Sequence, residues 1–278
     1  MQEKHPLRNP ARLAGRDVQE YYVGMFRRVA KRLLPHATRE ALRRGLIRWL
    51  PGSNYSVAYK HESELAFWRN YVAQAGTAPE TDYYRQFMMR MGNITAQSFF
   101  DGKVCLDIGC GPKGSLTWLT NARAAIGLDP LAESYCEFGI ANHRMLYLVS
   151  AAEHVPLLSS SVDVVFSMNS LDHVDELKQV CREIRRVLKP GGHFIASLNL
   201  DEPRTATEPW TLTEELLHKL LFAGWEKQYY EIRPRLPADG NEYFAPYKYF
   251  FEPCPPELMQ EKGPKALWCR FQVPVEPA

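Results

Sequence analysis

The 278-residue sequence lacks any run of about 18 uninterrupted apolar residues, so we expect no transmembrane helix. The first ten residues carry charge and proline without an apolar core, so we expect no secretory signal either. The six cysteines form no CxxC pair and follow no regular spacing, which favours reduced thiols in a cytoplasmic protein and no metal site. Apolar residues make up 45% and charged residues 24%, a composition typical of globular chains that excludes disorder.

Charge is unevenly distributed along the chain, although the net charge is only +2. Residues 1–50 contain 12 Lys or Arg against 4 Asp or Glu, whereas residues 101–278 contain 18 against 24. Apolar residues recur at helical spacing within residues 17–50, which predicts two basic amphipathic helices. Basic amphipathic helices can be exposed to solvent or lie on the surface of an anionic membrane. We favour these two interpretations over binding to an acidic partner or to nucleic acid. The sequence does not indicate an oligomeric state.

Three regions differ in pattern. We expect a basic helical extension over residues 1–59, an aromatic-rich helical lid over 60–100 and the main domain over 101–278. Within the main domain, strand patterns occur at 103–108, 125–129, 145–149, 162–168, 193–198, 225–233 and 266–273, and helix patterns at 115–121, 175–188 and 213–223. This alternation predicts an α/β fold with a doubly wound, mostly parallel seven-stranded sheet, in which the last two strands form an antiparallel edge.

The most informative motif is the glycine-rich loop of residues 106–114 (LDIGCGPKG), which follows a predicted strand. Gly109, Gly111 and Gly114 match G-x-G-x-x-G, a pattern compatible with a dinucleotide site or with a nucleoside site without phosphate. A pyrophosphate needs the positive end of the following helix, and the carboxylate of Asp107 would repel it. The same carboxylate would attract the amino group of an amino-acid moiety. We therefore favour the nucleoside and keep a nicotinamide-dependent dehydrogenase as an alternative.

A second carboxylate ends the next predicted strand. Asp129 lies 20 residues after Gly109, which places it at the tip of the neighbouring strand. There it can accept hydrogen bonds from both hydroxyls of a ribose. The alternative is that Asp129 is only a turn residue before Pro130.

Together these motifs resemble the class I S-adenosylmethionine-dependent methyltransferases of the type 11-like group. The resemblance covers residues 103–233 and rests on the LDIGCGP loop, Asp129, AEHVP at 152–156, DVVFS at 163–167 and RVLKPGG at 186–192. It implies a Rossmann-like methyltransferase fold and S-adenosylmethionine as the cofactor. The acid that often precedes Ala152 in such proteins is here Ala151, so the adenine amino group would need another partner.

The resemblance also implies which residues hold the cofactor. Asp107 and Gly109 would hold the methionyl end, Asp129 the ribose, and Leu131 the adenine ring. The full set that it implies is Asp107, Gly109, Cys110, Gly111, Asp129, Pro130, Leu131, Ala152, Glu153, Met168 and Asn169. Tyr84 or its neighbour Tyr83 would add a contact from the helical lid, with packing in the core as the alternative.

Residues 169–175 (NSLDHVD) follow the fourth predicted strand, where a methyl acceptor would lie. His173 is the candidate general base, oriented by Asp172 or Asp175, because an alcohol must lose its proton as it attacks the methyl group. The alternative is that His173 merely packs at the start of the next helix.

We expect methyl transfer to a hydroxyl of a small molecule. Residues 169–175 resemble methyltransferases of glycan pathways, which suggests a sugar or a glycolipid as acceptor. Glu208 and Trp210, in a loop after the fifth predicted strand, are candidate substrate contacts unless that loop is simply solvated. The alternatives are carbon or nitrogen methylation of a lipid-soluble or quinone-like acceptor, or a non-catalytic cofactor-binding protein. No metal-ligand cluster stands out in the sequence, so we expect no metal-dependent mechanism.

Overall fold

The structure, a computed structural model, describes residues 54–236, 245–260 and 263–275. The chain divides into two compact units between Ser56 and Val57, and almost all described residues belong to the second. The basic helices predicted within residues 17–50 lie outside the described residues. Among the described helices, none combines the length and the apolar character that crossing a membrane requires.

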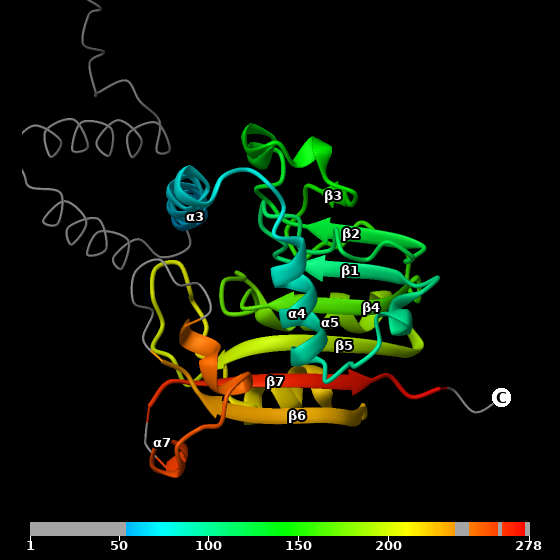
Figure 1. Ribbon diagram of the computed structural model, residues 1–278, viewed down its shortest axis with the longest axis vertical. Helices are drawn as coiled ribbons and strands as arrows, with labels where there is room; N and C mark the ends of the chain where they lie inside the picture. The colour runs from blue at the N-terminus through cyan, green and yellow to red at the C-terminus, as the bar shows by residue number, and fades with distance from the viewer. Residues whose placement is uncertain (1–53, 237–244, 261–262, 276–278) are drawn as a thin grey trace, which may run out of the picture. The chain divides into compact units, whose positions relative to one another are not determined.

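Seven strands form one sheet in the order β3-β2-β1-β4-β5-β7-β6 (Figure 1). The strands are β1 (Val104–Ile108), β2 (Ala124–Leu128), β3 (Leu146–Leu148), β4 (Val162–Met168), β5 (Leu188–Leu200), β6 (Glu226–Pro234) and β7 (Lys265–Gln272). The first five strands run parallel, and β7 pairs antiparallel with both β5 and β6. The predicted seven-stranded, mostly parallel sheet with an antiparallel edge is therefore confirmed.

Helices cover both faces of this sheet, with α4 on the near face and α5 behind it in Figure 1. The helices are α3 (Asn54–Ala75), α4 (Thr81–Met91), α5 (Leu177–Val187), α6 (Glu214–Leu217), α7 (Pro256–Gln260) and the short η2 (Gln97–Phe100), η3 (Ser134–Phe138), η4 (Ile140–Asn142), η5 (His218–Phe222) and η6 (Ala245–Phe250). Along β4, Val162 and Val165 belong to the cluster that buries α5, whereas Val164 and Phe166 belong to the cluster that buries α4. Side chains alternate between the two cores from Val164 to Phe166, as expected for a strand covered on both sides, and an irregularity in the pairing between Val162 and Val164 shifts this pattern at the start of β4.

The helix predicted at residues 115–121 is wrong, because these residues form a series of turns. The Thr117 hydroxyl donates to the Gly114 carbonyl at 2.7 Å, and the Trp118 indole donates to the Ser115 carbonyl at 2.9 Å. Side chains thereby take carbonyls that an α-helix would use. The glycine loop consequently runs into no regular helix, which removes a feature that a pyrophosphate site depends on.

The connection between α3 and α4, where the sequence predicted a break, is fastened to the glycine loop by a buried lysine. Lys113 is 1% exposed, and its ammonium group donates to the carbonyls of Gly76 and Ala78 at 2.7 Å each. The Glu80 carboxylate lies 3.4 Å from the same nitrogen. These contacts compensate the charge of Lys113 inside the fold. Lys113 thereby holds the connection between α3 and α4 against the glycine loop.

Replacing Lys113 with methionine tests this anchor. We expect Lys113→Met to lower the free energy of unfolding by about 2 kcal/mol, because two carbonyls lose their donor and Glu80 loses its cation. Lys189→Met is the matched control, since Lys189 is one-third exposed and pairs only with Asp163; there we expect less than about 1 kcal/mol. Chemical denaturation of the variants measures both values, and equal stability of Lys113→Met and the parent would contradict the anchor.

Candidate functional site

A cavity of about 210 Å³ opens at the carboxyl ends of β1, β2 and β4. Ligands of open α/β sheets bind at this edge. The glycine loop contributes Gly109 and Gly111 to the wall, and the end of β2 contributes Asp129, Pro130 and Leu131. The structure therefore brings together the loop and the acidic tip that the sequence predicted as one site.

Gly109 and Gly111 must be glycines for two reasons. Their φ angles are positive, and neighbouring side chains leave no room for a Cβ atom. Gly109 has φ +72°, and a Cβ there would lie 2.4 Å from the Cβ of Ser170. Gly111 has φ +58°, and a Cβ there would lie 2.7 Å from the indole ring of Trp68. Only glycine fits at both positions. Because neither residue has a Cβ atom, a ligand and helix α3 can both approach the loop backbone closely.

Asp129 is held in place by the backbone around it. The Gly111 amide donates to Oδ2 at 3.2 Å, and the Leu131 amide donates to Oδ1 at 2.9 Å. Burial raises the pKa of Asp129 to about 6, although these two amides act to lower it. A carboxylate fixed in this way at the cavity wall retains lone pairs for the hydroxyls of a ribose.

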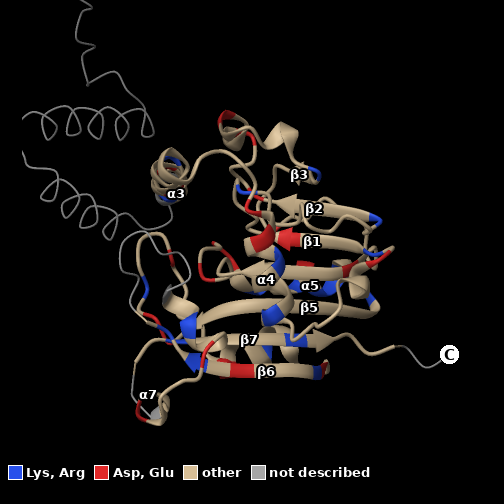
Figure 2. Ribbon diagram, in the orientation of Figure 1, with Lys and Arg blue, Asp and Glu red and all other residues tan. Residues whose placement is uncertain are grey.

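Asp107 and Cys110 differ from the prediction, because neither lines the cavity. Both are buried beneath the loop, where Cys110 packs against Gly127. Burial raises the pKa of Asp107 to about 7; the nearby Ser115 hydroxyl lowers it and the charge of Asp129 raises it further. Figure 2 shows acidic residues in red at the carboxyl end of β1, the strand whose fourth residue is Asp107. From this position Asp107 would act on a ligand in the cavity only by its charge across the loop, and Cys110 lies beneath the loop instead of in the cavity wall, where direct contact was predicted.

The remaining predicted cofactor residues line the opposite wall. Ala152 and Glu153 are present there, as are Met168 and Asn169 at the end of β4. Glu153 is also engaged in the fold, because its Oε1 accepts from the amides of residues 175 and 176 at 2.9 Å each. It therefore fixes the segment that leads into α5 as well as lining the cavity.

Buried acceptor atoms without partners test whether S-adenosylmethionine fits. Within the described part of the chain, Asp107 Oδ1 and Asn169 Oδ1 are buried and make no hydrogen bond. Such atoms are unfavourable unless a ligand satisfies them. An ammonium group would supply a hydrogen-bond donor to Asn169, which lines the cavity, and its positive charge would act on Asp107 across the loop; the adjoining Asp129 suits a ribose. The residues present therefore fit a nucleoside that carries a cationic amino-acid moiety.

Helix α3 closes the cavity with three residues that the sequence did not identify. Lys60, Glu64 and Trp68 line it at intervals of four residues, which places them on one helical face. The Trp68 indole donates to Glu64 Oε1 at 3.0 Å. Lys60 donates to the carbonyl of His173 at 2.8 Å. The spacing was visible in the sequence, but nothing in it indicated that this face meets the ends of the strands.

A larger cavity of about 810 Å³ adjoins the first and shares residues with it, including Met168, Asn169 and His173. Helices α3 and α4 give it an aromatic wall of Phe67, Tyr71, Tyr83 and Phe87, and its lining also includes Thr207, Glu208 and Arg235. The predicted contact from Tyr84 is corrected, because Tyr84 is 1% exposed and packs in the core. Consecutive helical residues point about 100° apart, so Tyr83 alone of the pair can face the cavity.

His173 lies where the two cavities meet. Its Nε2 is 3.9 Å from Asp172 Oδ1 and 3.9 Å from Glu208 Oε1. Burial raises the pKa of Asp172 to about 6; the charge of His173 opposes this shift and that of Glu208 adds to it. Asp175, the other residue predicted to orient His173, pairs with Lys60 instead. The structure thus brings Glu208 to the candidate base, across 35 residues of sequence.

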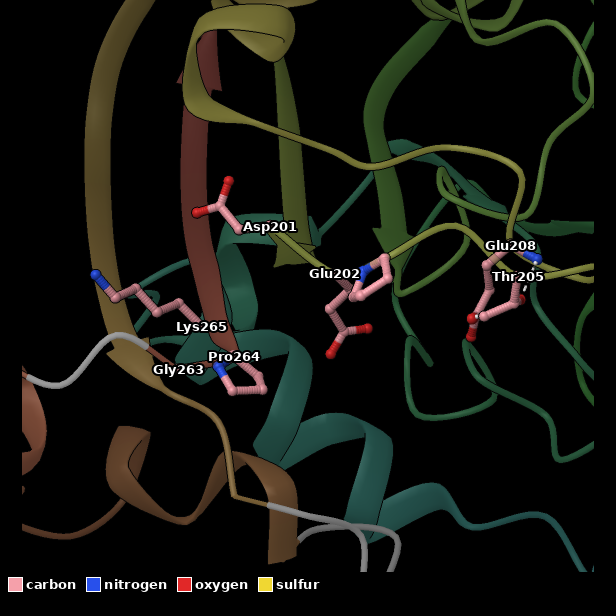
Figure 3. Close-up of a pocket in the computed structure, with 8 residues that line it drawn as sticks. Asp201, Glu202, Thr205, Glu208, Gly263, Pro264 and Lys265 are labelled. Carbon is pink, nitrogen blue, oxygen red and sulfur yellow. Dashed lines mark hydrogen bonds between the residues drawn. The ribbon is translucent and has the colours of Figure 1, made fainter.

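Trp210 has a structural position rather than the predicted contact with substrate. Its indole donates to the Val174 carbonyl at 3.0 Å, and its ring packs against the core outside both cavities. Glu208 stays in the site, where Thr205 Oγ1 donates to its Oε2 at 2.9 Å. Figure 3 shows this pair on the rim of a third, open cavity that also contains Asp201, Glu202 and Lys265.

Comparison with known proteins identifies the central part of the chain. Residues 106–196 match the family model described as a methyltransferase domain. A stretch of 99 residues is 33% identical to the sterol 4-C-methyltransferase strm-1 of Caenorhabditis elegans, covering 33% of this chain and 29% of that protein. A stretch of 123 residues is 30% identical to the malonyl-[acyl-carrier protein] O-methyltransferase of Enterobacter lignolyticus (strain SCF1), covering 44% of this chain and 49% of that protein. The chain therefore spans less than half the length of either relative.

Among solved structures, the chain is similar to an S-adenosylmethionine dependent methyltransferase from Mesorhizobium loti. The TM-score is 0.45 and the sequence identity 18%, with 64% of this chain and 98% of that chain covered.

Substitution of Gly109 tests the close approach at the glycine loop. We expect Gly109→Ala to weaken the binding of S-adenosylmethionine at least about tenfold, because the new methyl group would displace Ser170 and the loop backbone. Gly224→Ala is the control, since Gly224 also has positive φ (+81°) but nothing lies within 4 Å of its Cβ position. Calorimetric titration measures both affinities. Undiminished binding by Gly109→Ala would show that the loop does not contact the cofactor.

The raised pKa of Asp107 predicts pH-dependent binding. The carboxylate favours a cationic ligand and the neutral acid does not, so affinity falls as the pH drops through the pKa of about 7. We expect S-adenosylmethionine to bind about tenfold more weakly at about pH 6 than at about pH 8. Adenosine, which lacks the ammonium group, should change much less, and Asp107→Asn should remove the difference between the ligands. Identical pH profiles for both ligands in the parent protein would refute the role of Asp107.

Proposed function

We propose that the chain, whose residues 106–196 match a methyltransferase domain, uses S-adenosylmethionine to methylate a hydroxyl oxygen of a small molecule. The observation that carries the proposal is the position of His173, which lines both cavities at their junction. One cavity suits the methyl donor and the other is large enough for an acceptor. A proton acceptor is needed at that junction when the nucleophile is an alcohol.

The chain's own residues have few tasks in such a reaction. S-adenosylmethionine supplies an activated methyl group when bound. The glycine loop and Asp129 would hold the donor, and Met168 and Asn169 would line the space beside its methyl group. Nε2 of His173 takes the hydroxyl proton as the oxygen attacks, and the carboxylates of Asp172 and Glu208 stabilise the resulting imidazolium. Alignment of the two reactants supplies most of the remaining acceleration.

The lining of the larger cavity supports a sugar or a glycolipid as acceptor. The rings of Phe67, Tyr71 and Tyr83 line this cavity together with the polar groups of Thr207 and Glu208. A polyhydroxylated ring matches this combination, because its apolar face can pack on the aromatic rings while its hydroxyls meet the polar groups. A uniformly apolar quinone would leave those polar groups unsatisfied.

Carbon methylation is the second candidate. One relative is named a sterol 4-C-methyltransferase and another an O-methyltransferase, so the family allows either atom. A sterol-like acceptor would use the aromatic wall, of which Phe67 is 46% exposed. A non-catalytic protein would bind the cofactor and transfer its methyl group to no acceptor.

A screen of hydroxylated acceptors with labelled S-adenosylmethionine tests the proposal. We expect methyl transfer to an oxygen, and we expect His173→Ala to lower kcat by about a hundredfold while leaving cofactor affinity intact. His218→Ala, which changes an exposed histidine in η5 away from the site, should retain full activity. Methyl groups found on carbon or nitrogen in the product would refute oxygen as the nucleophile. Tight cofactor binding without turnover on any acceptor would favour the non-catalytic alternative.

A further inference from the structure

Three side chains beside the junction offer one ligand atom each. Asp172 Oδ1, His173 Nε2 and Glu208 Oε1 all lie within 4.8 Å of one another. Adjacent ligands of one small divalent ion lie about 3 Å apart, because each is about 2.1 Å from the metal. Side-chain movements of about 1 Å or less would therefore bring the three atoms into a single coordination sphere.

The buried member of this cluster lacks a partner. Asp172 is only 5% exposed at its side chain, and its Oδ1 makes no hydrogen bond with the described residues. This is the oxygen that points toward His173 Nε2, 3.9 Å away. A buried carboxylate oxygen without a donor is unfavourable, and a cation at this point would compensate it.

Glu208 is oriented by its neighbour. Thr205 Oγ1 donates to Glu208 Oε2, and the Glu208 amide donates back to Thr205 Oγ1, each at 2.9 Å (Figure 3). This closed pair directs the other oxygen, Oε1, toward His173.

The nearest cationic side chains are engaged elsewhere. Lys60 pairs with Asp175, and Arg235 pairs with Glu202 at 2.5 Å. Within the described residues, neither Asp172 nor Glu208 forms an ion pair with a lysine or an arginine. The negative charge of the cluster is therefore available to a bound cation.

We propose that Asp172, His173 and Glu208 bind a first-row divalent transition-metal ion such as Mn²⁺ or Zn²⁺. Two carboxylate oxygens and an imidazole nitrogen suit these ions better than Mg²⁺ or Ca²⁺, which prefer oxygen ligands throughout. His173 and Glu208 line the larger cavity, so the open coordination positions face the acceptor. The site selects acceptors that present an oxygen to the metal.

The inference rests on the proposed function, because it assigns the acceptor oxygen a place beside the donor. A bound ion occupies the lone pair of Nε2, so in the metal-loaded protein His173 no longer takes the proton. The hydroxyl proton would pass to solvent instead, and the oxygen would use the freed electron pair to form the bond to the methyl carbon. The bond between that carbon and the sulfonium sulfur would break, and its electron pair would stay on the sulfur of the departing S-adenosylhomocysteine. The metal keeps its charge throughout, and no oxidant or reductant is required.

Direct metal titration of the untagged full chain, freed of ions by a chelator, tests the site without any acceptor. We expect saturable binding of one Mn²⁺, followed by electron paramagnetic resonance, and of one Zn²⁺, followed by calorimetry. Glu208→Gln and Asp172→Asn should each weaken binding at least about tenfold. Glu202→Gln is the matched control, because Glu202 is a nearby acid outside the cluster, and it should bind nearly as the parent does. Glu208 is one-third exposed, so its variant keeps the test valid if the buried Asp172 substitution unfolds the chain.

The outcomes separate this inference from the proposed function. Absence of saturable binding in the parent, or equal affinity in Glu208→Gln and Glu202→Gln, overturns the metal site. Methyl transfer that runs equally fast with bound metal and in chelator overturns the selection of acceptors by the metal and leaves the proposed function standing. Metal binding that depends on Glu208 in a chain that methylates no hydroxyl supports the site and refutes the proposed function.

Discussion

Two carboxylates buried at adjacent strand ends are the constraint on which the rest of this site depends. Asp107 ends β1 beneath the glycine loop, and Asp129 follows β2 with backbone amides on both oxygens. Within the described chain, no lysine or arginine pairs with either. Two uncompensated buried charges are unfavourable for folding. A ligand that brings positive charge and hydroxyl donors would offset that cost, so the two carboxylates favour a cationic nucleoside at this edge of the sheet.

The lid helices complete the site because they are fixed to the same loop. Lys113, inside the loop, fastens the connection between α3 and α4 through two carbonyls. Trp68 on α3 then lies against Gly111, where any side chain would collide with it. Glu64 and Trp68 of α3 line both cavities, so the same helix shapes the proposed donor and acceptor sites. His173 stands at their junction and receives a hydrogen bond from Lys60 of α3 at its carbonyl.

Local patterns predicted the strands well, since runs such as 162–168 carry the physical signature of a buried strand. The residues predicted to hold the cofactor stay a prediction, of which Gly109, Gly111 and Asp129 lie in the wall of the smaller cavity. The helix predicted at residues 115–121 was wrong, because side chains there take the carbonyls that a helix would use. The cofactor contact predicted for Tyr84 was wrong because the position of Tyr84 around its helix directs it into the core. Prediction missed Lys60 and Glu64, because their contacts join residues far apart in the chain; the hydrogen bond from Lys60 to His173 spans 113 residues. The meeting of Glu208 with His173 depends in the same way on tertiary folding, and no sequence spacing reveals it.

The central claim is that the buried carboxylates select a cationic nucleoside over a dinucleotide diphosphate. Calorimetric titration of the full chain with S-adenosylmethionine and, separately, with NAD at neutral pH compares the two ligands directly. The account predicts saturable, one-to-one binding of S-adenosylmethionine and no measurable binding of NAD. Tighter binding of NAD than of S-adenosylmethionine would contradict it.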